Sequence, residues 1–210
     1  MAEGSVYDFF DESLHRGSRF PHAKQYKVSI DYGTGNPTSF GLYGINKSAT
    51  PKAWRIKGYW WDSKKEGRQK TDTEYSKDLK DFLTDVYCDG RSLGDIHPSS
   101  IIIDPSAASF KLQISKDHPQ YFVQDANNDV LDGIRTQAKM LQSGEYMISS
   151  DSSNDPCVKE YYAYSWDRNA AKRGLDKPLK QDDHTKDDER YFLHTEFGDS
   201  QLDYNILTRM

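Results

Sequence analysis

Two apolar segments of this chain each end on an aspartate, and this feature constrains the fold more than any other. The stretch KVSID alternates polar and apolar residues before Asp31, whereas in SSIIID a run of three isoleucines directly precedes Asp104. Alternation predicts a strand with one buried face, and a short apolar run predicts a strand buried on both faces. In open α/β sheets the carboxyl ends of the strands border the ligand crevice, so neighbouring strands of this kind would bring both carboxylates to one rim.

The remaining pattern predicts a mixed α/β fold. Strands are expected at residues 26–31, 38–45 and 53–62, which as consecutive strands suggest an antiparallel meander, and again at 99–105 and 121–125. Helices are expected at 74–87, with Asp72 or Thr73 as the cap, at 108–116 and at 130–144. From residue 158 onward the chain is expected to be helical or irregular.

Composition bounds the class of protein. A chain of 210 residues fits one α/β domain with a real core. Its mean hydropathy of −0.90 and the lack of any run near the ~18 apolar residues of a membrane span predict a soluble protein. The mixed, acidic N-terminus is not a secretory signal, which predicts a cytoplasmic location. Cys88 and Cys157 have no metal-ligand spacing and are expected to be reduced thiols.

The aspartates suggest a metal centre. Two carboxylates at one rim repel each other unless a cation neutralises them, and oxygen ligands suit Mg²⁺ or Mn²⁺. The segment DDHTKDDERY is the richest source of a third acid. On a helix Asp183, His184 and Asp187 share a face, whereas Asp188 and Glu189 rotate away from it. We predict Asp187 as the third ligand, with His184 beside it and Asp183 in support.

Each of these residues also has an ordinary structural explanation. Asp31 can cap a turn, and Asp104 can start a helix. The run DDHTKDD can be a solvated acidic surface. Taken singly, each structural explanation is the stronger one. Only the combination of two strand-end aspartates and a helical Asp-His-x-x-Asp favours a functional site.

Other motifs exclude several function classes. The glycines at 33 and 35 lead into Asn36-Pro37 rather than into a helix, so they do not form a dinucleotide-binding turn. The chain contains no phosphate-loop sequence and no Gly-x-Ser-x-Gly elbow. Its net charge of −5 is unlike that of most nucleic-acid binders, but residues 52–80 carry nine Lys and Arg against five Asp and Glu, a local net charge of +4.

Five ordered motifs resemble the C-terminal nuclease domain of the large terminase subunit of tailed bacteriophages. They are IDYGTGNPTSFGLYG, RQKTD, IIIDPSAASF, DGIRTQAKML and DHTKDDERY, and the likeness covers residues 3–195. The resemblance implies a ribonuclease H-like fold with a mixed central sheet flanked by helices. It also implies a two-metal endonuclease, with Mg²⁺ or Mn²⁺, that cuts concatemeric double-stranded viral DNA when packaging begins and ends. Catalytic roles would fall to Asp31, Asp104, Asp187 and His184.

The resemblance carries further expectations. Residues 1–24 would form a leader that packs on the domain, 25–196 the nuclease domain and 197–210 a tail. The partners would be double-stranded DNA, an ATPase motor domain, the small terminase subunit and the portal protein, in the host cytoplasm and without a membrane. Because RQKTD falls where related proteins have a hairpin near the site, Arg68 and Lys70 are candidates for contact with the DNA backbone. We predict that DNA binding depends mostly on backbone contacts, with Lys57, Lys64, Lys65, Arg68 and Lys70 as the basic patch. A resolvase or transposase-type nuclease, or a catalytically silent docking module, are the alternatives.

Overall fold

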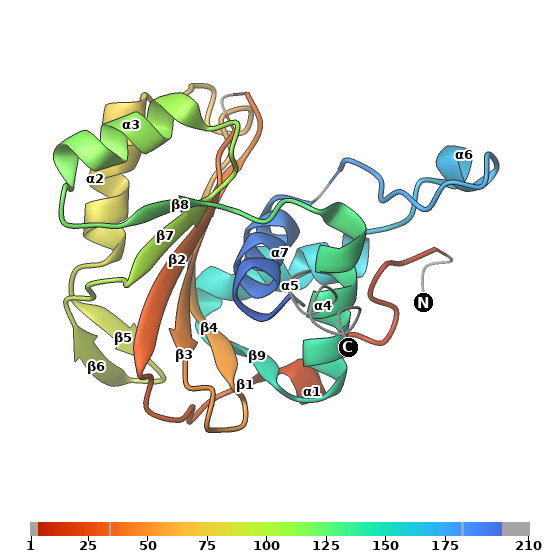
Figure 1. Cartoon of the computed structure of the whole chain (residues 1–210), viewed down its shortest axis with the longest axis horizontal. Helices are drawn as coiled ribbons and strands as arrows, with labels where there is room; N and C mark the ends of the chain where they lie inside the picture. The colour runs from red at the N-terminus through yellow and green to blue at the C-terminus, as the bar shows by residue number, and fades with distance from the viewer. Residues whose placement is uncertain (1–3, 34, 182, 199–210) are drawn as a thin grey trace, which may run out of the picture.

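One mixed β-sheet organises the molecule, which the computed structural model describes over residues 4–33, 35–181 and 183–198. Within these residues seven strands run in the order β1-β9-β4-β3-β2-β7-β8 (Figure 1). Their bounds are β1 Arg16–Gly17, β2 Gln25–Asp31, β3 Thr38–Ile45, β4 Ala53–Trp61, β7 Ser100–Ile103, β8 Val123–Asp125 and β9 Tyr146–Ser149. β2, β3 and β4 form the predicted antiparallel meander, and β7, β8, β9 and β1 join it in parallel pairs.

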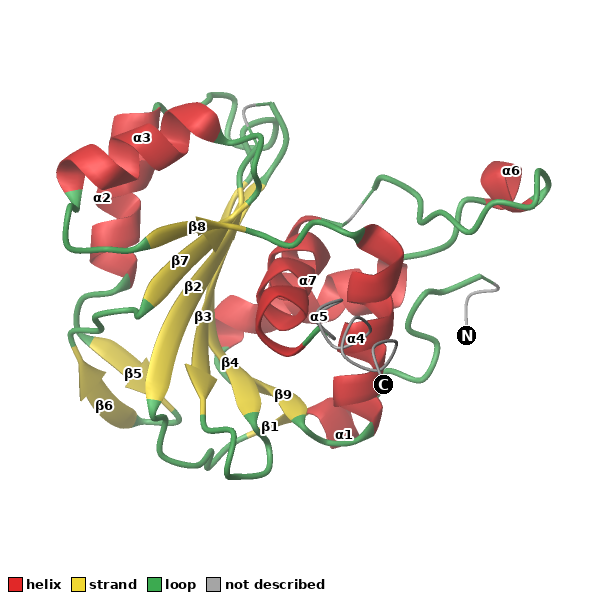
Figure 2. Cartoon of the chain, in the orientation of Figure 1, coloured by secondary structure: helices red, strands yellow, loops and turns green. Residues whose placement is uncertain are grey.

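Helices cover both faces of the sheet, as Figure 2 shows. On one face lie α2 (Asp72–Phe82) and α3 (Ala108–Asp117), and on the other lie α4 (Val130–Gln142), α5 (Asp155–Ala163) and α7 (His184–Phe197). The shorter elements are α1 (Glu12–His15), the 3-10 helix η1 (Ser152–Asn154), α6 (Arg168–Ala171) and the hairpin of β5 (Val86–Cys88) and β6 (Arg91–Gly94). The expected mixed sheet flanked by helices is confirmed.

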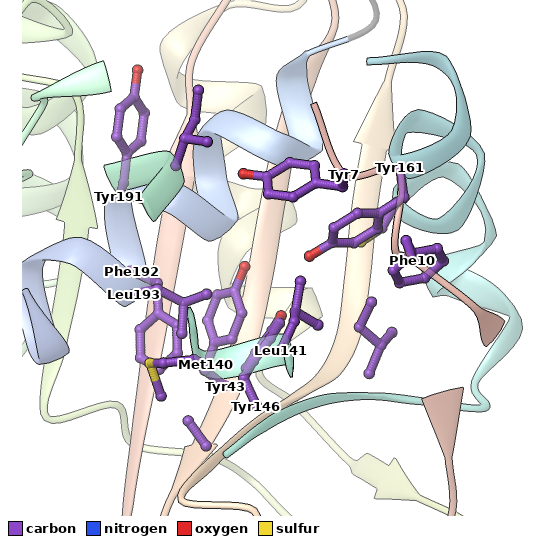
Figure 3. Close-up of a cluster of buried hydrophobic side chains, with 14 of the residues drawn as sticks. Tyr7, Phe10, Tyr43, Met140, Leu141, Tyr146, Tyr161, Tyr191, Phe192 and Leu193 are labelled. Atoms are coloured by element: carbon purple, nitrogen blue, oxygen red, sulfur yellow. The ribbon is translucent and has the colours of Figure 1, made fainter. Parts of the chain in front are cut away.

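The α7 face of the sheet is closed by an aromatic core (Figure 3). Tyr43 of β3 stacks on Phe192 of α7 with ring centroids 3.9 Å apart. Tyr146 of β9 is fully buried in the same cluster, and Tyr7 and Phe10 from the N-terminal segment pack into it. Such rings bury large apolar areas, so aromatic side chains supply much of the core on this face.

Two local predictions were wrong, and four short strands, β1, β5, β6 and β9, were not expected. The helix expected to reach residue 87 ends at Phe82, because residues 86–88 pair with β6 instead. Its cap is Thr71, whose hydroxyl and the Glu74 carboxylate form a capping box. The pattern also gave no sign of β9, a four-residue strand that pairs in parallel with β4. The pairing partner of this strand, β4, lies far away in sequence, so the pairing itself is evident only in the structure.

The N-terminal segment is part of the packed structure over its described residues. Tyr7 and Phe10 lie in the core, and β1 extends the sheet beside β9. At the other end, α7 continues to Phe197. The expected tail at 197–210 therefore begins inside this helix, and its residues 199–210 lie outside the described part, as do residues 1–3 of the expected leader.

Candidate functional site

The carboxyl ends of β2 and β7 lie side by side at one rim of the sheet. These strands are parallel neighbours with Ile30 paired to Ile103, so Asp31 and Asp104 follow directly at the same edge. A cavity of about 740 Å³ opens there. Its lining includes Asp31, Asp104, Asp183, His184 and Asp187. The structure thus gathers the five residues predicted for catalysis and metal binding around one cavity.

The chain turns away sharply after Asp31. A Cβ at Gly33 would lie 2.7 Å from the backbone oxygens of Asn36 and Pro37, so this close approach requires glycine. The tight turn sends the chain back as β3, and Asp31 stays at the end of its strand, facing α7.

The Asp31 carboxylate is hydrogen-bonded to the His184 imidazole across the site. His184 Nδ1 lies 2.9 Å from Asp31 Oδ2, and the Asp31 side chain keeps 16% exposure. Burial raises the pKa of Asp31 to about 7, against the hydrogen bond from His184, while Asp187 adds to the rise. Burial by itself would lower the pKa of His184, but the bond to Asp31 raises it above its ordinary value. The hydrogen bond therefore couples the protonation of the two side chains.

Asp104 is satisfied by neutral donors. The Ser106 amide donates to Oδ1 at 2.7 Å, and the Asn128 amide group and the Tyr191 hydroxyl donate to Oδ2 at 2.8 and 2.9 Å. Partial burial would raise the pKa of Asp104, but the hydrogen bonds from Ser106 and Tyr191 and the charge of Arg190 together hold the pKa below its ordinary value. Asp104 is therefore a charged carboxylate at the cavity wall.

Asp183 and Asp187, at the start of α7, both contact Lys180, which precedes the helix in the chain. Lys180 Nζ lies 3.1 Å from Asp187 Oδ2 and 3.5 Å from Asp183 Oδ2. Arg190, one turn along the helix, binds Asp187 Oδ1 through Nη2 at 2.9 Å. Burial and the nearby Asp187 carboxylate raise the pKa of Asp183, against the charge of Lys180. Protein cations thus balance part of the negative charge of the site.

The opposite side of α7 anchors it to the sheet. Asp188 is fully buried and pairs with Arg55 of β4 at 2.5 Å, and Ser39 of β3 donates to Asp188 Oδ2 at 2.6 Å. The same Ser39 hydroxyl lies 2.9 Å from the His184 carbonyl oxygen. Glu189 is buried as well and pairs with Lys186. These contacts set the rotation of α7, and with it the direction of the residues that face the cavity.

The donor set suits a hard divalent cation, although each acid has its own protein partner. Within residues 4–33, 35–181 and 183–198, no three His, Cys, Asp or Glu side chains are drawn together tightly enough to form a ready-made metal site. The cavity is nevertheless lined by six carboxylates, four of them from the predicted aspartates, and Asp183 Oδ2 is buried without a hydrogen-bond partner. Oxygen-only donors with a spare buried oxygen fit Mg²⁺ or Mn²⁺.

The predicted basic patch divides into two groups. Lys64 and Lys65, in the loop after β4, are exposed and line the cavity. The other three lie outside the lining: Lys57 Nζ sits 4.6 Å from the Phe82 ring centroid, Arg68 pairs with Glu74 at 2.8 Å, and Lys70 pairs with Asp78. Only two of the five side chains therefore stand at the acidic rim.

Several residues that line the cavity were not predicted from the sequence. Trp60 packs edge-on against His184 with centroids 5.9 Å apart, and Lys159, Glu160 and Lys180 also line the cavity. The position of Lys180, three residues before Asp183, was a sequence signal that could have indicated their contact. Glu160 had none, because it reaches the site from α5 through tertiary packing alone.

Several known structures share this fold. The chain superposes on the nuclease domain of the P22 large terminase with a TM-score of 0.65 and 14% identity, over 95% of this chain and 96% of that one. It superposes on the SPP1 large terminase nuclease domain, a structure with bound Mn, with a TM-score of 0.55 and 14% identity, over 82% and 86%. The fold is therefore that of the ribonuclease H-like nucleases.

A structure with higher sequence identity shows more closely which class of protein this chain resembles. The large terminase of a thermophilic bacteriophage, in complex with ATP-γ-S, is 40% identical, with a TM-score of 0.81 over 95% of this chain. The alignment covers 47% of that terminase chain, so this chain spans about half the length of the relative. These findings confirm the resemblance to the large terminase nuclease domain.

Two other comparisons were negative. No family model matches the chain, and no curated protein matches it significantly. A search of the described residues for membrane spans finds no helix with the length and apolar character needed to cross a bilayer.

Proposed function

We propose that this chain is the metal-dependent endonuclease domain of a viral DNA-packaging terminase, which cuts concatemeric double-stranded DNA when packaging begins and ends. The observation that carries the proposal is the convergence of Asp31, Asp104, Asp183, His184 and Asp187 on one cavity at the rim of the sheet. The 40% identity to the large terminase of the thermophilic bacteriophage and the bound Mn in the SPP1 nuclease structure support it.

In this proposal, Asp31, Asp104 and Asp187, with Asp183 beside them, hold two Mg²⁺ or Mn²⁺ ions. When bound, such a pair activates a water for in-line attack and stabilises the leaving 3′ oxygen of the phosphodiester. Asp31 orients the imidazole of His184 through Nδ1. The other ring nitrogen of His184 is then free to take up or release a proton at the cavity.

Lys180 has a defined place in this scheme. An ammonium group between two carboxylates occupies the kind of position that a divalent cation takes, and Lys180 Nζ lies within 3.5 Å of both Asp183 and Asp187. Its side chain is 59% exposed, so it can leave toward solvent at little cost. Metal binding would thus displace a protein cation.

An Asp31→Asn variant tests the activity. Plasmid nicking with Mn²⁺ should fall by more than the ~10–100-fold that follows loss of an outer partner of a metal ligand. Asp125→Asn is the matched control, because Asp125 also ends a parallel strand, β8, but lies outside the cavity lining. Full nicking activity in Asp31→Asn would refute the assignment.

DNA contact is proposed for the basic patch, with Lys64 and Lys65 foremost. A packaging nuclease that cuts when the head is full needs backbone contacts rather than base readout. Lys64→Glu with Lys65→Glu should weaken binding to duplexes of any sequence and lower the salt slope by about 1 per lost phosphate contact. Lys116→Glu with Lys139→Glu changes the net charge equally, away from the cavity lining, and is the control. Unchanged salt dependence in the first variant would exclude this contact.

The wider context is part of the same proposal. Residues 25–196 would be the nuclease domain, with 1–24 as the segment that connects it to an ATPase motor domain and 197–210 as a tail. The small terminase subunit and the portal protein would be its packaging partners, in the host cytoplasm.

A further inference from the structure

Asp183 stands at the N-cap of α7 but does not cap the helix. Aspartate at this position ordinarily accepts a hydrogen bond from an amide of the first turn. Here Asp183 makes no side-chain cap bond. The residue is only 5% exposed, and its Oδ2 is buried without a hydrogen-bond partner.

A glutamate from another helix does the capping instead. Glu160 of α5 accepts hydrogen bonds at Oε2 from the Thr185 amide at 2.7 Å and from the Lys186 amide at 3.3 Å. The Thr185 hydroxyl donates to the same oxygen. Glu160 is 6% exposed, so water competes little for this oxygen. The free amides at the start of α7 are thus satisfied from outside the helix.

From this arrangement we infer that Glu160 is a positioning residue for metal binding: by capping α7 it leaves the carboxylate of Asp183 free to bind a divalent cation in the cavity. The inference rests on the proposed function. Leaving a buried carboxylate oxygen without a partner costs free energy, so the arrangement is understandable where a ligand supplies the missing partner.

The neighbours of Asp183 agree with this role. Lys180 is the one cation within 4 Å of Asp183 Oδ2 among the described residues, at 3.5 Å and without a hydrogen bond. Asp187 has both oxygens engaged, one by Arg190 and one by Lys180. Of the two aspartates that contact Lys180, Asp183 is therefore the one with an oxygen that lacks a hydrogen bond.

Calorimetric titration with Mn²⁺ alone, on the full chain, tests the inference. Glu160→Ala removes the external cap, so Asp183 should turn to cap Thr185 and Mn²⁺ affinity should fall about 10-fold or more. Glu160→Gln keeps an acceptor oxygen in place and should bind Mn²⁺ nearly as the wild type does. Glu160→Asp, which keeps the charge but withdraws the carboxylate, provides a milder variant should Glu160→Ala fail to fold.

A double-variant cycle separates positioning from general structural support. If Glu160 acts through Asp183, adding Glu160→Ala to Asp183→Asn should weaken Mn²⁺ binding no further. A crystal structure of Glu160→Ala or Glu160→Asp should show the Asp183 carboxylate on the Thr185 amide. Additive effects in the cycle, with Asp183 unmoved in the crystal, would overturn the inference.

The two proposals fail in different ways. Wild-type protein that takes up no Mn²⁺ would overturn the metal centre and this inference with it. Wild-type uptake that is lost in Asp31→Asn but unchanged in Glu160→Ala and Asp183→Asn would overturn the role of Glu160 alone and leave the nuclease proposal standing.

Discussion

Two consecutive aspartates on α7 have opposite environments. Asp187 lines the cavity and pairs with Lys180 and Arg190, whereas Asp188 is fully buried against Arg55. A helix turns by about 100° per residue, so neighbours in sequence face different surroundings. Asp187 faces the proposed metal site, whereas Asp188 holds α7 against the sheet.

Removal of Asp188 should be costly to stability. Asp188→Ala leaves the guanidinium of Arg55, only 1% exposed, without the carboxylate that balances its charge, and should lower the free energy of unfolding by about 3–5 kcal/mol. Urea unfolding followed by tryptophan fluorescence measures this loss. The control is Arg135→Ala, whose ion pair with Asp132 is exposed and should contribute less than about 1 kcal/mol. Equal midpoints for the two variants would contradict the prediction.

At the scale of elements, α4 and α7 pack closely at Gly133. A Cβ at this position would lie 2.5 Å from Cγ of Arg190, near the base of that side chain, so the arginine would have to move. Arg190 in turn holds Asp187. The packing of two helices is therefore coupled to the direction of a proposed metal ligand.

Gly133→Ala should destabilise the protein, although alanine is ordinarily favoured over glycine inside a helix. Alanine stabilises an exposed helix interior by about 1 kcal/mol relative to glycine, but here overpacking should destabilise the protein by about 1–3 kcal/mol. Mn²⁺ affinity should fall as well, because Arg190 shifts. The same substitution in an Arg190→Ala background should be harmless, since the obstructing side chain is gone. A stabilised single variant would show that the helices can move apart freely.

On the scale of the whole molecule, the N-terminal segment completes the core. Phe10 stacks on Tyr161 of α5 with centroids 4.0 Å apart and planes inclined by 2°. β1 then pairs with β9 and covers that edge of the sheet. The segment thus contributes both to the hydrophobic core and to the protection of an otherwise open strand.

Phe10→Ala should therefore destabilise the entire domain. Truncating a buried phenylalanine costs about 3–5 kcal/mol, and the loss should appear as a lower urea midpoint of a single cooperative transition. Leu14→Ala, four residues later, is the matched control, because Leu14 is 67% exposed and its loss should be nearly neutral. A separate early transition in Phe10→Ala would instead mean that the segment unfolds independently.

Some features of this protein could be read from local sequence. The alternation before Asp31 and the apolar run before Asp104 predict strands that end on acids, and the spacing of Asp183, His184 and Asp187 places them on one helical face. Each of these inferences needs only residues within one segment, because strand and helix periodicity are local properties of the backbone.

Other features were decided by the tertiary structure alone. The cap from Glu160, the burial of Arg55 against Asp188 and the pairing of β9 with β4 each join residues far apart in the chain. No local pattern encodes such contacts, since they exist only once the sheet and helices have packed. The sequence by itself therefore determined which acids end which elements, and packing determined which carboxylate oxygens have a hydrogen-bond partner and which do not.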